Sequence, residues 1–217
     1  MGLKIKICGI TNAGDAMAAI EAGADALGFM FYEQSPRNVS IASVAKIARE
    51  LPPFVSLVGV FVDPTEEVIA QAQGECGLDA LQFHGQESTA FCERFAHHRI
   101  IKSFRIQNAE SLRGLPAYRT AAWLLDSHVP GQLGGTGTRF NWDLASEARK
   151  LGRPIILAGG LTARNVAEAI RKVQPYAVDV STGVESAPGR KDPDKLREFI
   201  TAARQFDSPE GELPNFT

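Results

Sequence analysis

A cysteine and an aspartate each stand near the end of a short apolar run, where such side chains could exchange protons with a substrate. Cys8 closes the run KIKIC and Asp126 closes the run AAWLLD. A thiolate can remove a proton and a carboxylic acid can donate one, so the two types together could perform general acid/base chemistry. Each also has a simpler interpretation: a cysteine is commonly a small buried hydrophobe, and an aspartate after a strand can cap the next turn.

The residues around Cys8 favour chemistry over packing. Alternate side chains of a strand face opposite ways, so Lys6 and Cys8 share one face and Ile5 and Ile7 share the other. The isoleucines suit a face that packs against helices, which leaves Lys6 and Cys8 about 6 to 7 Å apart on the opposite face. A nearby ammonium group favours the thiolate form of a cysteine.

Apolar runs rich in Val, Ile, Leu and Phe alternate with stretches of helical spacing along the 217 residues. The runs cover residues 4–9, 25–31, 55–61, 79–85, 99–106, 121–127, 154–160 and 177–183. Strict alternation of strand and helix is typical of a parallel sheet, and eight units suggest that the sheet closes. We therefore predict an α/β protein, a single-domain (β/α)8 TIM barrel. An open doubly wound sheet is the alternative, although the chain lacks the GxGxxG turn that often follows its first strand.

Local signals suggest where elements and the domain begin and end. Asn12, Thr65 and Thr162 precede stretches of helical spacing, and Gly23 and Gly74 fall where helices are expected to end. We assign residues 1–206 to the barrel. Residues 207–217, DSPEGELPNFT, are polar and contain Pro and Gly, which predicts a loose C-terminal tail.

The composition is that of an ordinary globular protein, with 22% charged residues and a net charge of −2, and gives no reason to expect nucleic acid as a partner. No apolar run approaches the roughly 20 residues that span a bilayer, and the N-terminus lacks the apolar core of a secretory signal. We expect a cytoplasmic protein with no membrane partner. The cysteines, Cys8, Cys76 and Cys92, have no CxxC spacing, which argues against a disulfide framework or a structural zinc site.

Two glycine turns follow the seventh and eighth predicted strands, at Gly159-Gly160 and at Ser181-Thr182-Gly183. Barrels frequently bind phosphate with the loops after these two strands, because glycines let backbone N–H groups approach the anion. The pattern therefore predicts a phosphate site. A long glycine-rich stretch at residues 130–139 suggests a binding loop, but it lacks the GxxxxGK[ST] pattern of a P-loop.

Three further polar residues are candidates with plain alternatives. Arg37 could pair with a carboxylate through two hydrogen bonds, although surface arginines are commonly just solvated. His84 could be a core or capping histidine. Asp179 faces away from its valine neighbours, hence into the barrel, where a carboxylate needs a partner.

Taken together, these segments resemble the phosphoribosylanthranilate isomerase family. Matching stretches occur in order between residues 4 and 192, and include KICGIT, GFMFYEQSPRNVS, LQFHGQE, LLDS, GGTGTRFNW, LAGGLTARNV and DVSTGVESAPGRKD. KICGIT and the SPR element are specific to that family, whereas LAGGL and the last glycine turn are shared with other phosphate-binding barrels. Thr182 stands where the family more often has serine, which leaves the role of that residue open.

The resemblance implies an activity in tryptophan biosynthesis. It is the Amadori rearrangement of N-(5-phosphoribosyl)anthranilate to 1-(o-carboxyphenylamino)-1-deoxyribulose 5-phosphate, without a cofactor or a metal. The resemblance makes Cys8 the general base and Asp126 the general acid. It also implies that Arg37 binds the anthranilate carboxylate and that His84 and Asp179 line the substrate site. The residues implied to hold or close over the phosphate are Gly135, Thr136, Gly159, Gly160, Ser181 and Gly183.

Two other functions compete with this reading. One is a related barrel, such as indole-glycerol-phosphate synthase or the histidine-pathway aminoaldose isomerase, but these use carboxylates or lysine, and a cysteine after strand one argues against them. The other is a non-catalytic phosphosugar-binding barrel, which would not need both Cys8 and Asp126. We expect a small phosphoribosyl substrate as partner and a monomer or a homodimer, between which the sequence does not decide.

Overall fold

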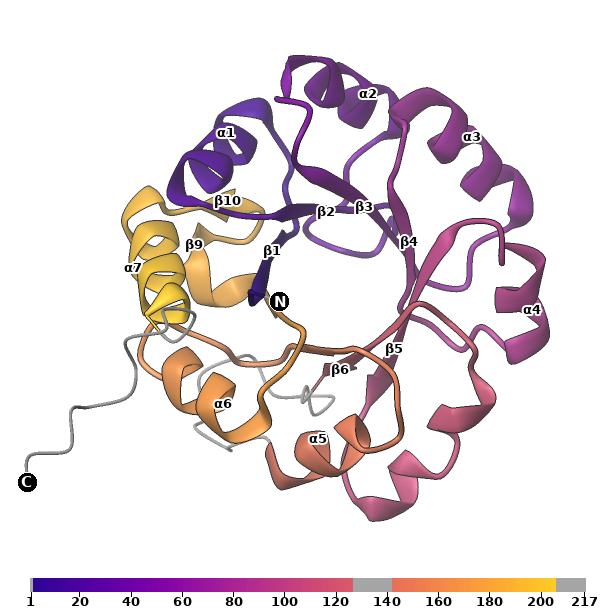
Figure 1. The fold of residues 1–217 in the computed structure, drawn as a ribbon. Coiled ribbons are helices and arrows are strands. Elements are labelled where there is room, and N and C mark those ends of the chain that lie inside the picture. Colours follow the sequence, from indigo (N-terminus) through magenta and orange to yellow (C-terminus); the bar gives the residue numbers. More distant parts are fainter. Residues whose placement is uncertain (1, 127–141, 206–217) are drawn as a thin grey trace, which may run out of the picture.

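Eight parallel strands close into a barrel in the computed structural model, which describes residues 2–126 and 142–205 (Figure 1). Strands that follow each other in the chain are neighbours in the barrel, and the eighth pairs with the first. The strands are β1 (Lys4–Cys8), β2 (Ala26–Met30), β3 (Ser56–Phe61), β4 (Ala80–Phe83), β5 (Arg99–Arg105), β6 (Ala122–Asp126), β7 (Ile155–Leu157) and β8 (Ala177–Val180). The predicted (β/α)8 barrel is thus confirmed, and the open-sheet alternative is wrong.

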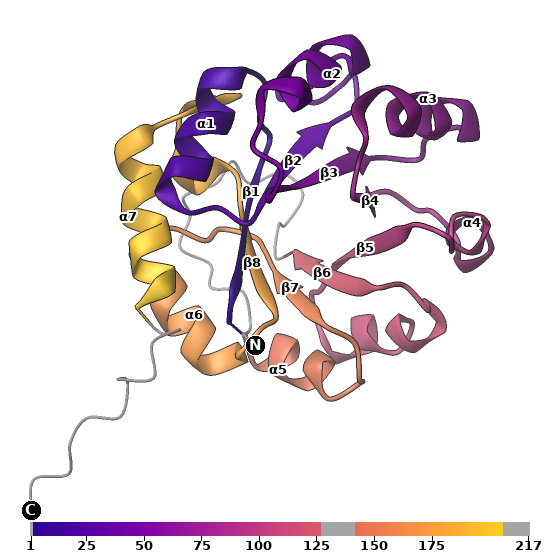
Figure 2. The ribbon, with the colours of Figure 1, turned by 45° about the horizontal axis from the view of Figure 1, so that its top comes forward.

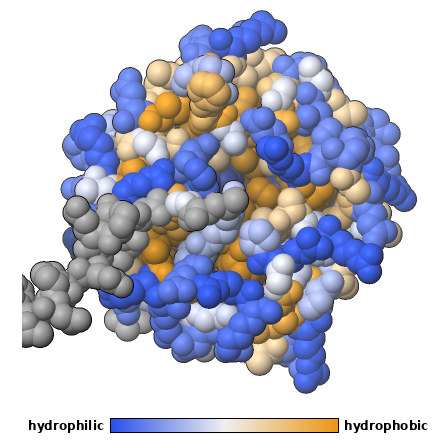
Figure 3. Space-filling view, in the orientation of Figure 1, coloured by the Kyte–Doolittle hydropathy of each residue, from blue (hydrophilic) through white to orange (hydrophobic). Residues whose placement is uncertain are grey.

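Helices surround the barrel on its outside, as Figures 1 and 2 show. They are α1 (Ala13–Ala22), α2 (Ile41–Glu50), α3 (Glu66–Cys76), α4 (Thr89–Arg94), α5 (Trp142–Arg149), α6 (Val166–Val173) and α7 (Pro193–Arg204). Hydrophilic side chains cover much of the rim that these helices form (Figure 3). Among the described residues, no helix is long and apolar enough to cross a membrane.

Two connections depart from the strand–helix alternation. Between β5 and β6 the chain forms two short 3-10 helices, η1 (Ala109–Leu112) and η2 (Leu115–Ala117), in place of an α-helix. Gly114 and Pro116 lie in this stretch, and proline removes a backbone donor that a longer helix would need. After β8 the chain forms the 3-10 helix η3 (Thr182–Val184) and then a hairpin of β9 (Glu185–Ala187) and β10 (Arg190–Lys191).

Asn12 and Thr65 cap α1 and α3 as predicted, and Gly23 ends α1 in the left-handed conformation. The prediction that Gly74 ends a helix is wrong. Helix α3 continues through Gly74 and ends at Gly77, whose φ is 62°.

The predicted helix after Thr162 begins later, at Val166, because the residues in between form a turn. The side chain of Asn165 stabilises that turn by accepting a hydrogen bond from the Thr162 backbone at 2.8 Å.

The core has two layers, one between strands and helices and one inside the barrel. Ile5 and Ile7 of β1 are fully buried in the outer layer, as their alternation predicted. The inner layer is smaller and consists of Val58, Ala80, Ile101, Ala122, Leu124, Ile156, Ala158 and Ala177. Polar side chains on the inward face, such as Lys6, Gln82 and Asp179, are also buried. The barrel therefore has a polar interior at the level where Cys8 stands.

The described elements run from Lys4 to Arg204. The predicted tail, residues 207–217, lies outside the described residues, as do Gly135 and Thr136. The division at residue 206 therefore stays a prediction.

Candidate active site

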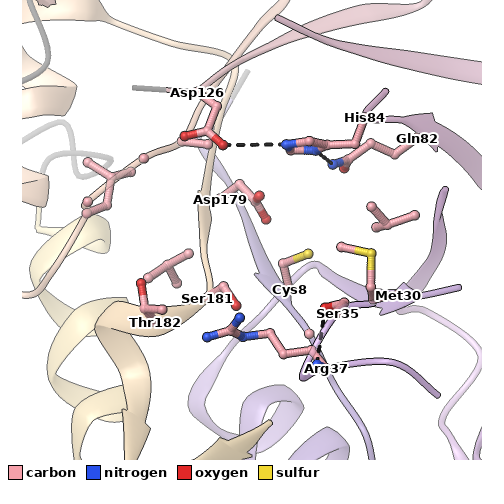
Figure 4. Close-up of a pocket in the computed structure, with 17 residues that line it drawn as sticks. Cys8, Met30, Ser35, Arg37, Gln82, His84, Asp126, Asp179, Ser181 and Thr182 are labelled. Atoms are coloured by element: carbon pink, nitrogen blue, oxygen red, sulfur yellow. Dashed lines mark hydrogen bonds and ion pairs between the residues drawn. The ribbon is translucent and has the colours of Figure 1, made fainter. Parts of the chain in front are cut away.

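A cavity of about 210 Å³ lies at the carboxyl ends of the barrel strands. Every described residue predicted for the site, except Gly183, lines it (Figure 4). These residues are Cys8, Arg37, His84, Asp126, Gly159, Gly160, Asp179 and Ser181. Closure of the barrel thus brings the carboxyl ends of β1, β4, β6, β7 and β8 around the same cavity.

Cys8 lies in a slot between buried polar groups. The Lys6 ammonium is 2.8 Å from Asp179 Oδ1, and both side chains are buried. Gly28 on β2 faces the thiol, and a Cβ atom there would lie 2.8 Å from Cys8 Sγ. The absence of a side chain at Gly28 therefore makes room for the thiol, a contact that the sequence analysis missed.

The charge state of Cys8 reflects opposing influences. Burial raises the pKa of the Cys8 thiol, Lys6 lowers it, Asp179 raises it and Lys191 lowers it, and the net pKa is above the usual value. Although burial would lower the pKa of Lys6, the charge of Asp179 raises it, so Lys6 stays an ammonium. The expected effect of Lys6 on Cys8 is present, but burial outweighs it.

Asp126 is oriented by a chain of two neighbours. His84 Nε2 lies 3.4 Å from Asp126 Oδ2, and His84 Nδ1 lies 3.1 Å from the amide nitrogen of Gln82 (Figure 4). One ring nitrogen of His84 therefore faces Asp126 and the other faces the Gln82 amide. Gln82 was not predicted from the sequence, although it lies two positions before His84 and so on the same side of the chain at the end of β4.

Arg37 is held by a carboxylate of the chain itself. Its Nε donates to Glu185 Oε1 at 2.8 Å and its Nη2 donates to Glu185 Oε2 at 2.7 Å. The arginine stem crosses Gly9, where a Cβ atom would lie 2.5 Å from Arg37 Cδ. Gly9 also has a φ of 78°, so the glycine of KICG is required both by the backbone and by Arg37. From the sequence, Arg37 could pair with a carboxylate or be solvated, and nothing pointed to Glu185 as its partner.

The turn after β7 presents donors toward the cavity. Gly159 and Gly160 have φ values of 83° and 63°, and no described backbone group accepts a hydrogen bond from their N–H groups. Asn165 fixes this turn by donating to the Gly160 carbonyl at 3.0 Å. In the neighbouring loop after β8, the Ser181 hydroxyl is buried and has no hydrogen-bond partner among the described residues. An anion with several oxygens could accept from these groups.

Gly183 is the described phosphate candidate that does not line the cavity. A Cβ atom on Gly183 would lie 2.0 Å from the Leu161 carbonyl oxygen, so the loops after β7 and β8 touch at this glycine. Its observed part is to let the two loops approach each other.

Replacing Gly183 with alanine should therefore force these loops apart and lower the free energy of unfolding by about 1 to 3 kcal/mol. Urea unfolding measures this change. The matched control is Gly74→Ala, at an exposed helical position where nothing lies within 4 Å of the added atom. That variant should gain about 0.5 to 1 kcal/mol. Wild-type stability of Gly183→Ala would contradict the contact.

Within residues 2–126 and 142–205, no group of three His, Cys, Asp or Glu side chains could hold a metal ion. Cys8, Cys76 and Cys92 are all buried free thiols.

Known proteins match this chain over nearly its whole length. A family model described as N-(5'phosphoribosyl)anthranilate (PRA) isomerase matches residues 5–202. A relative from Citrifermentans bemidjiense, named N-(5'-phosphoribosyl)anthranilate isomerase, is 53% identical over 203 residues, which cover 94% of this chain and 98% of the relative.

Solved structures agree with the sequence match. Phosphoribosyl anthranilate isomerase from Thermotoga maritima superimposes with a TM-score of 0.89 at 42% identity, covering 94% of this chain and 99% of that one. A phosphoribosyl anthranilate isomerase in complex with reduced 1-(o-carboxyphenylamino)-1-deoxyribulose 5-phosphate has a TM-score of 0.85 at 40% identity, with the same coverage.

Proposed function

The chain belongs to the phosphoribosylanthranilate isomerase family, and we propose that Cys8 and Asp126 perform the proton transfers of its reaction. The protein is an isomerase of tryptophan biosynthesis. The assignment of roles rests on one observation: a thiol on β1 and a carboxyl group on β6, far apart in the chain, line the same cavity. Each lies beside its own neighbours, Lys6 and Asp179 for Cys8 and His84 for Asp126, so they can act on two sides of one sugar.

Asp126 acts first, as the general acid. In its protonated form it donates to the ribose ring oxygen while the anomeric nitrogen supplies electrons and the C1–O bond breaks, which leaves an iminium ion. The contact with His84 keeps the carboxyl group directed into the cavity. Asp126 is left as a carboxylate beside His84 Nε2.

Cys8 then acts as the general base. Its thiolate removes the proton from C2, which the adjacent iminium has made acidic, and the product is an enolamine that tautomerises to the ketone. Both protons move between the substrate and side chains of this chain, so the steps call for no cofactor. The raised pKa of Cys8 makes its thiolate scarce at neutral pH but strongly basic.

The remaining lining residues position the two ends of the substrate. The N–H groups of Gly159 and Gly160, which donate to no described backbone group, suit the phosphate together with the Ser181 hydroxyl. Arg37 suits the anthranilate carboxylate, and His84 and Asp179 line the sugar between them. The parts of Gly135, Thr136 and Gly183 in phosphate binding stay predictions from the resemblance.

A Thermotoga maritima member of the family is described as dimeric. For this chain, monomer and homodimer remain the two alternatives, and its cytoplasmic location stays a prediction. Size-exclusion chromatography with light scattering distinguishes the two states.

Turnover is tested with freshly prepared N-(5'-phosphoribosyl)anthranilate, whose anthranilate-type fluorescence should fall when the purified protein is added. The double variant Cys8→Ala/Asp126→Asn, purified in the same way, is the control for contaminating activity. If the fluorescence falls no faster with the wild-type protein than with this control, the proposed activity is wrong.

A further inference from the structure

A buried lysine completes an ion-pair network behind Arg37. The Lys191 ammonium, with a fully buried side chain, lies 2.9 Å from Glu185 Oε1. It also donates to the Cys8 carbonyl at 2.6 Å and to the Ser181 carbonyl at 3.4 Å. Residues 185–191 form the hairpin of β9 and β10, so one short segment contacts the backbone of β1, the turn after β8 and the cavity arginine.

The contacts fix the charge of each member. All three neighbours of Lys191 Nζ are acceptors, which suits an ammonium group with its three hydrogens. Burial lowers the pKa of Lys191 and the Glu185 carboxylate opposes this, so the charge of Lys191 rests on these acceptors. The Glu185 oxygens receive only donors, from Arg37 and Lys191, so Glu185 is a carboxylate. Although burial would raise the pKa of Glu185, these hydrogen bonds hold it below its usual value. Two positive groups and one negative group leave the network with a single net positive charge.

Arg37 keeps a free edge toward the cavity. Glu185 occupies Nε and one hydrogen of Nη2, and no described residue accepts a hydrogen bond from Nη1. A planar guanidinium can bind a second carboxylate along its Nη1–Nη2 edge. Paired with Glu185 alone, however, the arginine would be neutralised and would attract that carboxylate weakly.

We propose that Glu185 and Lys191 are positioning residues for recognition of the substrate carboxylate. Glu185 fixes the direction in which Arg37 presents its free edge, and Lys191 cancels the charge of Glu185, so Arg37 attracts an anion as if unpaired. The proposal rests on the proposed function, because it takes the aromatic carboxylate of the substrate as the group that Arg37 binds.

The test compares two ligands that differ only in that carboxylate. One is reduced 1-(o-carboxyphenylamino)-1-deoxyribulose 5-phosphate and the other is its phenylamino counterpart without the carboxyl group. Calorimetry gives the Kd of each, and the ratio of the two is the carboxylate preference. Binding is measured rather than turnover because Lys191 also contacts the backbone of Cys8. A distorted site weakens both ligands and leaves the ratio unchanged.

The expected ratios follow the charge of the network. Lys191→Met leaves it neutral and should lower the preference about tenfold, and Arg37→Ala should abolish it. The double variant Glu185→Gln/Lys191→Met restores one positive charge and should recover most of the carboxylate preference. If the network were purely structural, the preference of the double variant would be at least as low as that of Lys191→Met. Lys195→Met is the control, since the ammonium group of this exposed lysine donates to the Glu185 backbone carbonyl and to no other described residue. Its ratio should stay wild-type.

Each failure has its own meaning. If Lys191→Met weakens both ligands equally, or the double variant stays as low as Lys191→Met, the charge-compensating role is wrong. Should Lys191→Met not fold, Lys191→Gln, which is neutral but can still donate hydrogen bonds, takes its place under the same criteria. If wild type turns over its substrate but binds both ligands equally, the inference fails and the isomerase activity stands. Absence of wild-type turnover would instead count against the proposed function.

Discussion

Replacing Cys8 with serine should lower kcat by at least about 100-fold, because a hydroxyl of similar size cannot supply an anionic base near neutral pH. The cavity should keep its shape, since the slot opposite Gly28 accepts the smaller oxygen atom. The fluorescence assay at saturating substrate gives kcat, and the Kd of the reduced product analogue serves as the control for an intact site. A serine variant with kcat within tenfold of wild type would remove Cys8 from the proton transfer.

The same assignment gives a pH dependence with a definite sign. Because burial raises the pKa of Cys8, the limb of the kcat/KM profile that reports this thiol should lie above the pH at which an ordinary thiol ionises. Lys6 lowers this pKa and Asp179 raises it. Lys6→Met should therefore move the limb to higher pH and Asp179→Asn to lower pH. If the pH profile of kcat/KM does not shift in folded variants, Lys6 and Asp179 have only a structural role.

Asp126→Asn should also lower kcat by at least about 100-fold, because an amide of the same shape cannot protonate the ribose oxygen. The contact with His84 survives the substitution, so substrate binding should change little and the loss should fall on kcat. His84→Gln is the companion variant. It removes a group that orients Asp126 but not the proton donor, so its loss should be the smaller of the two. An Asp126→Asn enzyme with near-normal kcat, or a larger loss for His84→Gln, would contradict the assignment.

The parts of the molecule that could be predicted are those that depend on a local repeating pattern of apolar and polar residues. The alternation of Lys6 and Cys8 with two isoleucines fixes which face of β1 is inward, whatever the strand pairs with. Recurrence of strand and helix likewise indicated the barrel. The inward direction of Asp179 followed from the same rule.

Partners across the barrel could not be predicted in this way. Lys6 and Asp179 are 173 positions apart, and Arg37 and Glu185 are 148 apart, so no local pattern joins them. Their pairing depends on closure of the sheet and on the hairpin after β8. The start of α6 was mispredicted for a related reason. The Asn165 side chain forms hydrogen bonds within the turn before this helix, and helical spacing in the sequence does not reveal such contacts.

The hairpin of β9 and β10 also has a consequence for the order in which the molecule is made. Ribosomes deliver Cys8 and Arg37 early, but the groups that hold them, Glu185 and Lys191, emerge only after the last barrel strand. Lys191 binds the backbone of Cys8 directly, and its own N–H donates to Asp15 at 2.8 Å. Cys8, the proposed base, is therefore synthesised long before the residues that complete its pocket.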